Sequence, residues 1–375
     1  MILHITNDYS SSTVYKNLIG KLDGQGLAQT IYTPVKTSQS IGKNKIPLKN
    51  ERSSIIYSNI LNKHLDRILF PRKINKIFID IQSKVDIDNI SCIHAHTWYS
   101  DGAVALKLHL KYKIPYIIAV RSTDLNVFWK LPHLHKQGLE IVKHAKKIIF
   151  INPSYKTTFL ESKSIKKRYS SLHQKTTVIP NGIDEFWINN LEPRKNKINA
   201  NINIIYVGTF LKRKNILNLI LAVEELIKKD VDCTLNLVGV GGSEEEKILK
   251  HSANNPAIKF HGKVVDKTDL KDLYNQSDIF AMPSLKETFG LVYGEALSQG
   301  IPVLYTKNEG IDGVFDENIG VGINPNSVQE ITTGLLELIT NYKQYDFDPK
   351  EICARLDWGK IAVKYHEIYE QLITK

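Results

Sequence analysis

Short apolar runs typical of buried parallel strands recur along the chain, and each is followed by a loop and a helical pattern. The first repeat consists of the run at residues 2–6, a helical pattern from Thr13, and the run at residues 28–32. Further runs lie at residues 91–96, 116–120, 147–152, 176–180, 202–207, 234–238, 259–264, 278–282 and 301–305. This alternation predicts an α/β fold with doubly wound parallel sheets, whose ligands lie beyond the carboxyl ends of the strands.

The chain is long enough for two such sheets. Its 375 residues exceed one ordinary domain, and its apolar fraction of 42% is sufficient for two cores. A polar segment rich in Lys and Asn, residues 189–201, precedes the run at 202–207. We therefore predict an N-terminal domain at residues 1–188, a linker at 189–201, and a second domain at 202–356 followed by a terminal helix at 357–375.

The composition narrows the possible partners and the compartment. A net charge of +11, from 50 basic and 39 acidic side chains, suits a phosphorylated substrate, an anionic membrane leaflet or a nucleic acid. The basic residues form no tail and no RNA-binding aromatic motif is present, so we expect no nucleic-acid partner. Three scattered cysteines indicate a reduced, cytoplasmic protein without a zinc site. With no signal-peptide pattern and no run approaching 18 apolar residues, membrane contact would be peripheral.

One candidate for membrane contact is the stretch at residues 56–69. Its apolar residues at helical spacing are Ile56, Ile60, Leu61, Leu65, Ile68 and Leu69, and the basic residues among or beyond them are Lys63, Arg67, Arg72, Lys73 and Lys76. The pattern predicts either a basic amphipathic helix on anionic lipid or a core-facing helix with a solvated basic face. We favour the second.

Two glutamates eight residues apart dominate the stretch at residues 282–303. Thr288 is a candidate cap for a helix that starts at Phe289-Gly290-Leu291, contains Glu295 and stops at Gly300. The free amides of the first helical turn can hold an anion such as a diphosphate. Carboxylates can grip sugar hydroxyls, and Glu287 and Glu295 return to within about 80° of the same helix face. The stretch therefore predicts a nucleotide-sugar site.

The same stretch resembles the E-x7-E signature of retaining GT-B glycosyltransferases, family 4 in particular. The matching residues are Pro283, Ser284, Glu287, Phe289, Gly290, Leu291, Glu295, Gly300 and Pro302. The resemblance implies two Rossmann-like domains facing an interdomain cleft, with the donor in the second domain. It further implies that Glu287 orients the transferred sugar and that Glu295 binds the ribose. The nucleotide sugar is then a substrate, and we expect no metal or other cofactor.

The loop after the run at 202–207 supplies the expected phosphate contacts. By the resemblance, Lys214 aligns with the phosphate-binding lysine and Gly208 with the loop glycine. Thr209 stands where the family usually has arginine, and either Lys212 or Arg213 can substitute for that cation. We assign Gly208, Arg213, Lys214, Phe289, Gly290, Leu291 and Glu295 to donor binding.

Two strand ends in the first half carry further candidates. His94 and His96 share a strand face, and two histidines without a third ligand are more often structural than metal-binding. In the family, a histidine in this loop reaches the junction of donor and acceptor, which makes His96 a catalytic candidate beside Glu287 and Lys214. Arg121 follows the run at 116–120, where it either binds a phosphate or acidic sugar or forms a structural ion pair with Asp124.

These observations predict a retaining glycosyltransferase that moves a sugar from a nucleotide-sugar donor to a glycan acceptor. Cytoplasmic location, the basic balance and the family resemblance favour a lipid-linked glycan in surface polysaccharide synthesis, with peripheral contact to an anionic membrane. Two alternatives share the architecture. One is a non-catalytic partner subunit that binds a nucleotide sugar, and the other is a DNA-modifying glycosyltransferase.

Overall fold

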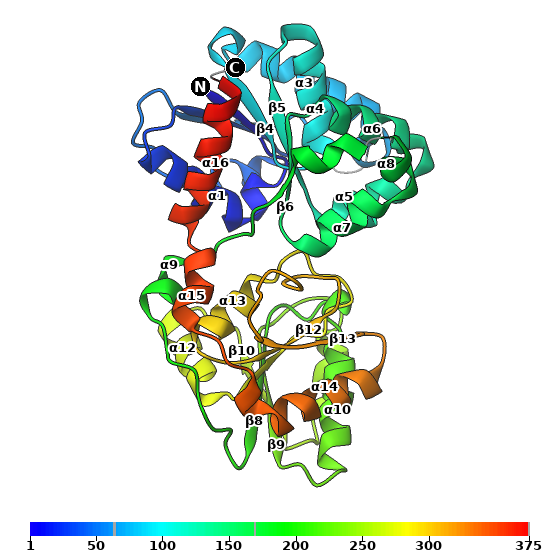
Figure 1. The fold of residues 1–375 in the computed structure, drawn as a ribbon, viewed down its shortest axis with the longest axis vertical. Helices are drawn as coiled ribbons and strands as arrows, with labels where there is room; N and C mark the ends of the chain where they lie inside the picture. The colour runs from blue at the N-terminus through cyan, green and yellow to red at the C-terminus, as the bar shows by residue number, and fades with distance from the viewer. Residues whose placement is uncertain (63–64, 169, 374–375) are drawn as a thin grey trace. The chain divides into compact units, whose positions relative to one another are not determined.

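The computed structural model describes residues 1–62, 65–168 and 170–373, and the chain divides into two compact units (Figure 1). Unit 1 comprises Met1–Asn181 and Trp358–Lys375, and unit 2 comprises Gly182–Asp357. Each unit contains one parallel sheet with helices packed on it. The predicted α/β architecture with two doubly wound domains is therefore confirmed.

Unit 1 is built on a sheet with the strand order β3-β2-β1-β4-β5-β6-β7, in which all neighbouring strands are parallel. Its strands are β1 (Ile2–Ile5), β2 (Gln29–Pro34), β3 (Ser54–Ser58), β4 (Cys92–Ala95), β5 (Tyr116–Val120), β6 (Lys147–Phe150) and β7 (Thr176–Val178). The central strands are buried throughout, as expected for a parallel sheet covered on both faces.

The helices of unit 1 are α1 (Thr13–Gly24), α2 (Leu65–Ile68), α3 (Phe70–Lys84), α4 (Ser100–Tyr112), α5 (Ser122–Asn126), α6 (His135–His144), α7 (Pro153–Glu161), α8 (Lys163–Arg168) and α16 (Trp358–Ile373). The terminal helix α16 lies alongside α1 and also contacts β4 (Figure 1). Its buried face, which includes Trp358, Ile361, Tyr365 and Tyr369, belongs to the same apolar cluster as residues of α1, β1, β4, β5 and β6.

The predicted helix over residues 56–69 is not formed as a unit. Residues up to Ser58 belong to β3, because the β-branched and aromatic run Ile55-Ile56-Tyr57 pairs with β2 at the sheet edge. Helical structure begins at Leu65 in α2 and continues in α3. The expectations for Lys63 and for the side chains of Arg67 and Ile68 lie outside what the structure describes. Lys76 pairs with Asp66 at 3.1 Å, so the charge of this lysine is compensated within the stretch.

Unit 2 has the strand order β10-β9-β8-β11-β12-β13, again with all neighbours parallel. Its strands are β8 (Ile202–Val207), β9 (Cys233–Val238), β10 (Ile258–Gly262), β11 (Ile279–Ala281), β12 (Val303–Thr306) and β13 (Gly320–Ile323). Its helices are α9 (Glu185–Asn189), α10 (Ile216–Ile227), α11 (Glu245–Ser252), α12 (Lys267–Gln276), α13 (Leu291–Ser298), α14 (Val328–Thr340) and α15 (Pro349–Arg355).

The chain passes between the units twice. The contacts assign residues 182–188 to unit 2, whereas the sequence analysis placed them in the N-terminal domain. Ile183 N donates to Leu356 O at 3.0 Å, and α9 packs on α13 and α15. The second passage lies between Asp357 and Trp358, after which α16 joins unit 1.

Within the part of the chain that the structure describes, no helix combines the length and the apolar character needed to cross a bilayer.

Candidate functional site

The strand order of unit 2 reverses between β8 and β11, and the loops after these two strands meet. In such sheets, ligands bind beyond the carboxyl ends of the strands at the point of reversal. The loop after β8 runs through a short 3-10 helix, Lys212–Lys214, and the loop after β11 contains Glu287. Leu285 N donates to Arg213 O at 2.8 Å, which fastens one loop to the other.

Lys214 and Glu287 form the central contact between these loops. Lys214 Nζ lies 2.5 Å from Glu287 Oε2, and the two side chains are 12% and 8% exposed. Lys214 Nζ also lies 3.3 Å from Met282 Sδ. An ammonium group has three donors, and two acceptors contact this one among the described residues, which leaves one N–H for an additional acceptor such as a phosphate oxygen. The structure thus brings together two residues that the sequence assigned to catalysis.

Glu287 is held in place on several sides. Ser284 Oγ lies 3.4 Å from Glu287 Oε2, and Thr288 N donates to Glu287 Oε1 at 3.0 Å. Glu287 N donates to Glu309 Oε2 at 3.1 Å, and Glu309 Oε1 pairs with Lys286 Nζ at 2.6 Å. Glu309 follows β12 and is 7% exposed. No sequence motif marks Glu309, because only the neighbouring positions of β11 and β12 bring it to Glu287.

Arg213 is the second cation near Glu287. Its NH1 atom lies 3.8 Å from Glu287 Oε2 and donates to Lys286 O at 3.4 Å, and its side chain is 49% exposed. The sequence left Lys212 and Arg213 open as substitutes for the arginine that the family usually has at the position of Thr209. Of these two, Arg213 is the residue that the structure brings to the Glu287 carboxylate.

Helix α13 begins two residues later than the sequence predicted. Its first residue is Leu291 and its N-cap is Gly290, with φ of +75° and no capping side chain. A side chain at Gly290 would meet the Tyr293 ring at 2.6 Å, so glycine is required here both by conformation and by space. Thr288 is therefore not the cap. Phe289 is 2% exposed and anchors the loop in the core just before the helix.

Glu295 lies in surroundings that differ from those of Glu287. The Tyr274 hydroxyl lies 3.5 Å from Glu295 Oε2. Burial raises the pKa of Glu295 to about 7, and Asp184 adds to this effect, while the Tyr274 hydroxyl, Lys267 and Trp187 oppose it. The two carboxylates of the motif thus contact different partners, so the structure does not join them into one acid pair.

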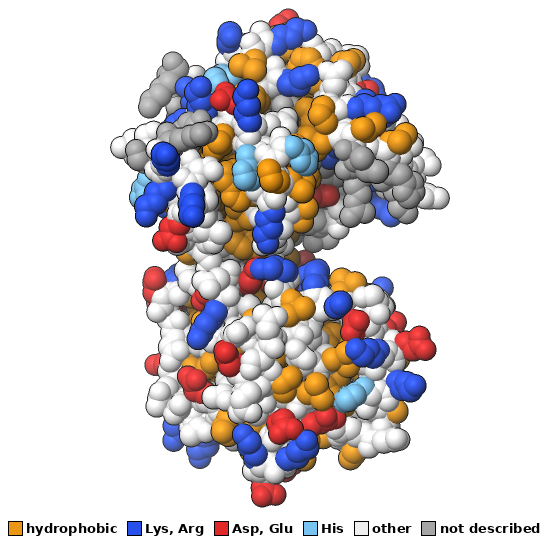
Figure 2. Space-filling model, turned by 90° about the vertical axis from the view of Figure 1, so that its right-hand side faces the viewer, with side chains coloured by type: hydrophobic (Ala, Val, Ile, Leu, Met, Phe, Trp, Pro, Cys, Tyr) orange, Lys and Arg blue, Asp and Glu red, His pale blue; other side chains and the backbone are white. Residues whose placement is uncertain are grey.

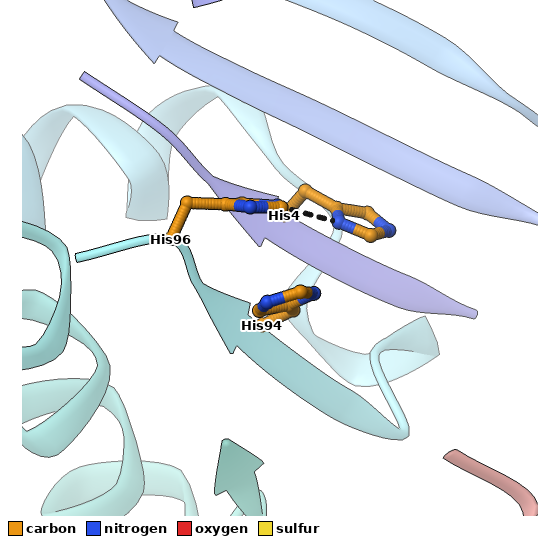
Figure 3. Close-up of side chains that lie close together, drawn as sticks. All are labelled: His4, His94 and His96. Carbon is orange, nitrogen blue, oxygen red and sulfur yellow. Dashed lines mark hydrogen bonds between the residues drawn. The ribbon is translucent and has the colours of Figure 1, made fainter. Parts of the chain in front are cut away.

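Unit 1 contains a cluster of three buried histidines at the corresponding reversal of its sheet, between β1 and β4 (Figure 3). His4 of β1 lies directly opposite His94 of β4. His96 follows β4, and its backbone N donates to Ile5 O at 3.1 Å. The sequence marked only His94 and His96 as candidates. His4 was missed because 90 residues separate it from His94, and only the strand order makes them neighbours.

Hydrogen bonds and ring stacking organise this cluster. His4 Nδ1 and His96 Nε2 are 3.0 Å apart, and His94 Nδ1 lies 2.7 Å from the Tyr369 hydroxyl of α16. The rings of His94 and His96 are stacked with their centroids 3.9 Å apart. Burial lowers the pKa of His4 to about 3, and it holds the pKa values of His94 and His96 well below the usual 6.5. All three imidazoles are therefore neutral at pH 7.

Three histidines are also a common set of zinc ligands. On a tetrahedral Zn²⁺, ligand nitrogens lie about 3.4 Å from one another, given Zn–N bonds of about 2.0–2.1 Å. Here the candidate nitrogens all lie within 4.8 Å of one another, but one pair is already hydrogen-bonded at 3.0 Å. The in-plane lone pairs of the stacked rings of His94 and His96 lie in nearly parallel planes, so they do not converge on one point (Figure 3). The geometry fits a hydrogen-bonded cluster better than a metal centre.

Arg121 lies close to this cluster. Its Nε atom donates to His96 O and its NH1 atom to Asn181 Oδ1, both at 3.3 Å. Asp124 instead accepts hydrogen bonds from the backbone N atoms of Trp98, Tyr99 and Arg121. The guanidinium is thus used to hold the backbone after β4, and Asp124 ties the same loop to the start of α5.

Two family models match the chain, one in each half. The model described as "Glycosyltransferase Family 4" matches residues 11–185, and the model described as "Glycosyl transferases group 1" matches residues 189–348. Together they span nearly the whole chain and include the site residues discussed above except His4 and Tyr369.

Individual proteins also resemble this chain, in sequence or in structure. The putative teichuronic acid biosynthesis glycosyltransferase TuaC of Bacillus subtilis is 27% identical over 300 residues, which are 76% of this chain and 71% of that protein. The sucrose-phosphate synthase of Thermosynechococcus elongatus superposes with a TM-score of 0.75 at 18% identity, over 100% of this chain and 99% of that one. HepE of Anabaena, solved in complex with UDP and glucose, superposes with a TM-score of 0.68 at 17% identity, over 98% and 99%. The two parallel-sheet units thus form the GT-B fold, and the chain belongs to the glycosyltransferases of family 4.

Proposed function

We propose that unit 2 binds a nucleotide-sugar donor at the reversal point between β8 and β11. The observation that supports this most strongly is the contact of Lys214 with Glu287 at the carboxyl ends of these strands. The site offers Lys214 and Arg213 for a diphosphate and the first amides of α13 as further donors. HepE, whose solved structure contains UDP and glucose, has the same fold, which makes UDP-sugars the first donors to test.

In this proposal each carboxylate has its own task. Glu287 holds hydroxyls of the transferred sugar, while Glu295 accepts hydrogen bonds from the ribose hydroxyls. Lys214 keeps its contact with Glu287 and uses its remaining N–H to stabilise the charge that grows on the departing diphosphate. Because lysine and arginine supply this positive charge, the proposed reaction uses no metal ion. The sugar is transferred with retention of configuration, and an oxygen of the leaving phosphate takes the proton of the acceptor hydroxyl.

The experiment for the donor site compares two neighbouring lysines. Thermal stability is measured with UDP-, GDP-, ADP- and CMP-sugars for the wild type, Lys214→Ala and Lys212→Ala. Lys212 belongs to the same short helix but is exposed. We expect one class of nucleotide sugar to stabilise the wild type and Lys212→Ala but not Lys214→Ala. Equal stabilisation of all three proteins would contradict the proposed site.

We further propose that the acceptor is a lipid-linked glycan of surface polysaccharide synthesis, used at the cytoplasmic face of an anionic membrane. The printed name of TuaC, which refers to teichuronic acid biosynthesis, supports this. A groove of about 670 Å³ in unit 1 is lined by Pro132, His135, Lys136, Leu139, Glu140, Lys163, Ser164 and Lys167. Its three lysines have no carboxylate within ion-pair distance among the described residues, so the groove is suited to lipid phosphates.

Vesicle sedimentation tests the membrane part of the proposal. We expect binding to vesicles of anionic phospholipid at low salt, and loss of binding in the double variant Lys163→Glu/Lys167→Glu on α8. The control Lys247→Glu/Lys250→Glu reverses two exposed lysines on α11 and should bind as the wild type does. On the face drawn in Figure 2, Lys and Arg are scattered and do not form one stripe.

A further inference from the structure

Arg121 carries a positive charge that no carboxylate balances directly. It follows β5 and is half-buried. Asp124 is the acidic residue beside it, but the carboxylate of Asp124 accepts from the backbone N atoms of Trp98, Tyr99 and Arg121. Within the described residues, no carboxylate lies within ion-pair distance of the guanidinium, whose two hydrogen bonds go to neutral oxygens. The structural ion pair with Asp124 that the sequence left open is therefore not formed.

The guanidinium of Arg121 has more donors than the protein uses. An arginine side chain has five N–H donors in one plane. Nε donates to His96 O and Nη1 donates to Asn181 Oδ1, which leaves three N–H groups without an acceptor in the described part of the chain. Nη2 donates to no described residue and is not among the buried atoms that lack a partner. The protein thus fixes one side of the guanidinium and leaves the other side accessible.

The ring side chains around Arg121 are neutral. The Tyr15 ring centroid lies 6.0 Å from Arg121 Cζ. Burial lowers the pKa values of His94 and His96 and raises the pKa of Tyr365. Among the described residues, Arg121 is the only Arg or Lys whose charge also acts on these three groups. A partly buried charge in such surroundings costs free energy unless an opposite charge joins it.

Arg121 also lies where a ligand of this sheet would bind. It follows the carboxyl end of β5, which neighbours β4, and the strand order reverses between β1 and β4. The hydrogen bond to His96 O places the guanidinium beside the loop that follows β4. Ligands of doubly wound sheets bind at such a reversal, beyond the carboxyl ends of the strands. An anionic group of a substrate can therefore supply the missing counter-charge.

We propose that Arg121 binds the carboxylate of an acidic sugar, so that unit 1 selects a substrate whose ring carries a carboxyl group. The inference rests on the proposed transferase function and names the class of sugar that it uses. The planar fork of arginine matches a carboxylate through two parallel N–H···O bonds. The single negative charge of a carboxylate equals the single positive charge of Arg121, whereas a phosphate monoester carries nearly two charges at pH 7.

Binding of small sugars tests the site without any transfer reaction. The probes are the methyl glycosides of glucose and galactose, of glucuronic and galacturonic acid, and of the two hexose 6-phosphates, which differ within each series only at C6. Their affinities for the full chain are measured by ligand-observed NMR titration. We expect one uronic acid to bind about 10- to 100-fold more tightly than the matched neutral sugar and the matched phosphate. Tighter binding of a 6-phosphate would overturn the proposal in favour of a phosphate site.

Variants of Arg121 test whether the guanidinium causes the preference. Arg121→Gln should bind the uronic acid and the neutral sugar alike, and Arg121→Lys, which keeps the charge without the fork, should show an intermediate preference. The control Arg52→Gln changes an exposed arginine of the same unit and should bind as the wild type does. An unchanged preference in Arg121→Gln would overturn the proposal. Thermal unfolding without sugar checks that each variant folds, and the comparison of probes on the wild type does not depend on the variants.

Two further measurements distinguish the source of the carboxylate. One compares the affinities of UDP-glucuronic and UDP-galacturonic acid with those of UDP-glucose and UDP-galactose. The other compares transfer to the methyl glycosides of the uronic acids and of the neutral sugars. A preference in the first assigns the carboxylate to the transferred sugar, and a preference in the second assigns it to the acceptor. No preference for a carboxylated sugar in either measurement or in the NMR titration would overturn the proposal. If no nucleotide sugar bound, the proposed donor site would fail, while the NMR titration would still decide on Arg121.

Discussion

Lys214 and Glu287 are each other's main counter-charge, with 2.5 Å between Nζ and Oε2 although 73 residues separate them in the sequence. Both side chains are largely buried, so the pair is screened less by salt than a surface pair. The pair couples the group that would face the diphosphate to the group that would face the sugar. Changes on either side are therefore expected to affect both binding and transfer.

Lys214→Ala should lower the rate of transfer by about 10²–10³, because it removes a preorganised contact to the charge that develops on the leaving group. It also removes the nearer of two cations beside Glu287, since Arg213 NH1 lies 3.8 Å from Oε2. The measurement is the initial rate of nucleotide release in the presence of acceptor. Lys212→Ala should stay within about 2-fold of the wild type, and a comparable loss in both variants would show that the phosphate contact is misassigned.

Glu309→Ala should reduce kcat by about 10-fold while the Kd for the donor changes little. Glu309 accepts from the backbone N of Glu287 and pairs with Lys286, so its loss loosens the carboxylate that orients the sugar. Steady-state kinetics and calorimetric titration with the donor separate the two effects. The control is Glu317→Ala, which breaks an ion pair with Arg355 elsewhere in unit 2 and should leave both constants as they are.

Donor affinity should increase as the pH rises through about 7, since burial raises the pKa of Glu295 to about 7 and the ribose hydroxyls bind its ionised form. Binding at pH 6 should then release a proton, which is measured by calorimetry in buffers of different ionisation enthalpy. Glu295→Gln should remove the proton release. An identical pH dependence in the wild type and Glu295→Gln would mean that another group titrates.

The same carboxyl predicts how the stability of the free protein changes with pH. A pKa raised from the usual 4.5 to about 7 means that the folded state holds the proton more tightly than the unfolded state. The contribution of Glu295 to stability is therefore complete below about pH 4.5 and is lost as the pH rises to about 7. Relative to Glu295→Gln, the wild type should lose stability over this interval, which urea unfolding at several pH values measures.

Tyr369→Phe should lower the unfolding free energy of unit 1 by about 1–2 kcal/mol, because it leaves Nδ1 of His94 buried without its partner. Tyr365→Phe on the same helix is the matched variant, since the Tyr365 ring stacks on His94 at 5.2 Å. We expect its effect to be much smaller. Similar losses in both variants would attribute the effect to packing of the rings and not to the hydrogen bond.

Continuous apolar runs located every strand except the two edge strands β3 and β13, because strands buried on both faces need no alternating pattern and differ from their flanking loops in composition. A terminal helix was also expected, at 357–375, and the structure has α16 at Trp358–Ile373, since Ile361, Tyr365 and Tyr369 share one face of a regular helix. The prediction of a helix at 56–69 was wrong, because tertiary pairing outweighed a local pattern. The apolar spacing fits a helix, but Ile55 and Ile56 pair with β2 as part of a strand.

The sequence could not mark those candidate site residues that come together only through contacts between distant parts of the chain. Motif spacing marked Lys214, Glu287 and Glu295 as candidates, because these lie at strand or helix ends that a local pattern can mark, and the structure brings Lys214 to Glu287. His4 and Glu309 lie in or just beyond strands without any local signal, and their neighbours come from other strands. The start of α13 was misplaced because Thr288 is a good capping residue in isolation, whereas the positive φ of Gly290 depends on the close approach of Tyr293.

The two passages of the chain between the units have a consequence for synthesis on the ribosome. All of unit 2 is translated before α16, yet α16 supplies Trp358, Ile361, Tyr365 and Tyr369 to the core of unit 1. The part of the protein that is synthesised first is thus completed last, and its apolar face for α16 is uncovered until then. During translation this nascent face is a natural binding site for chaperones.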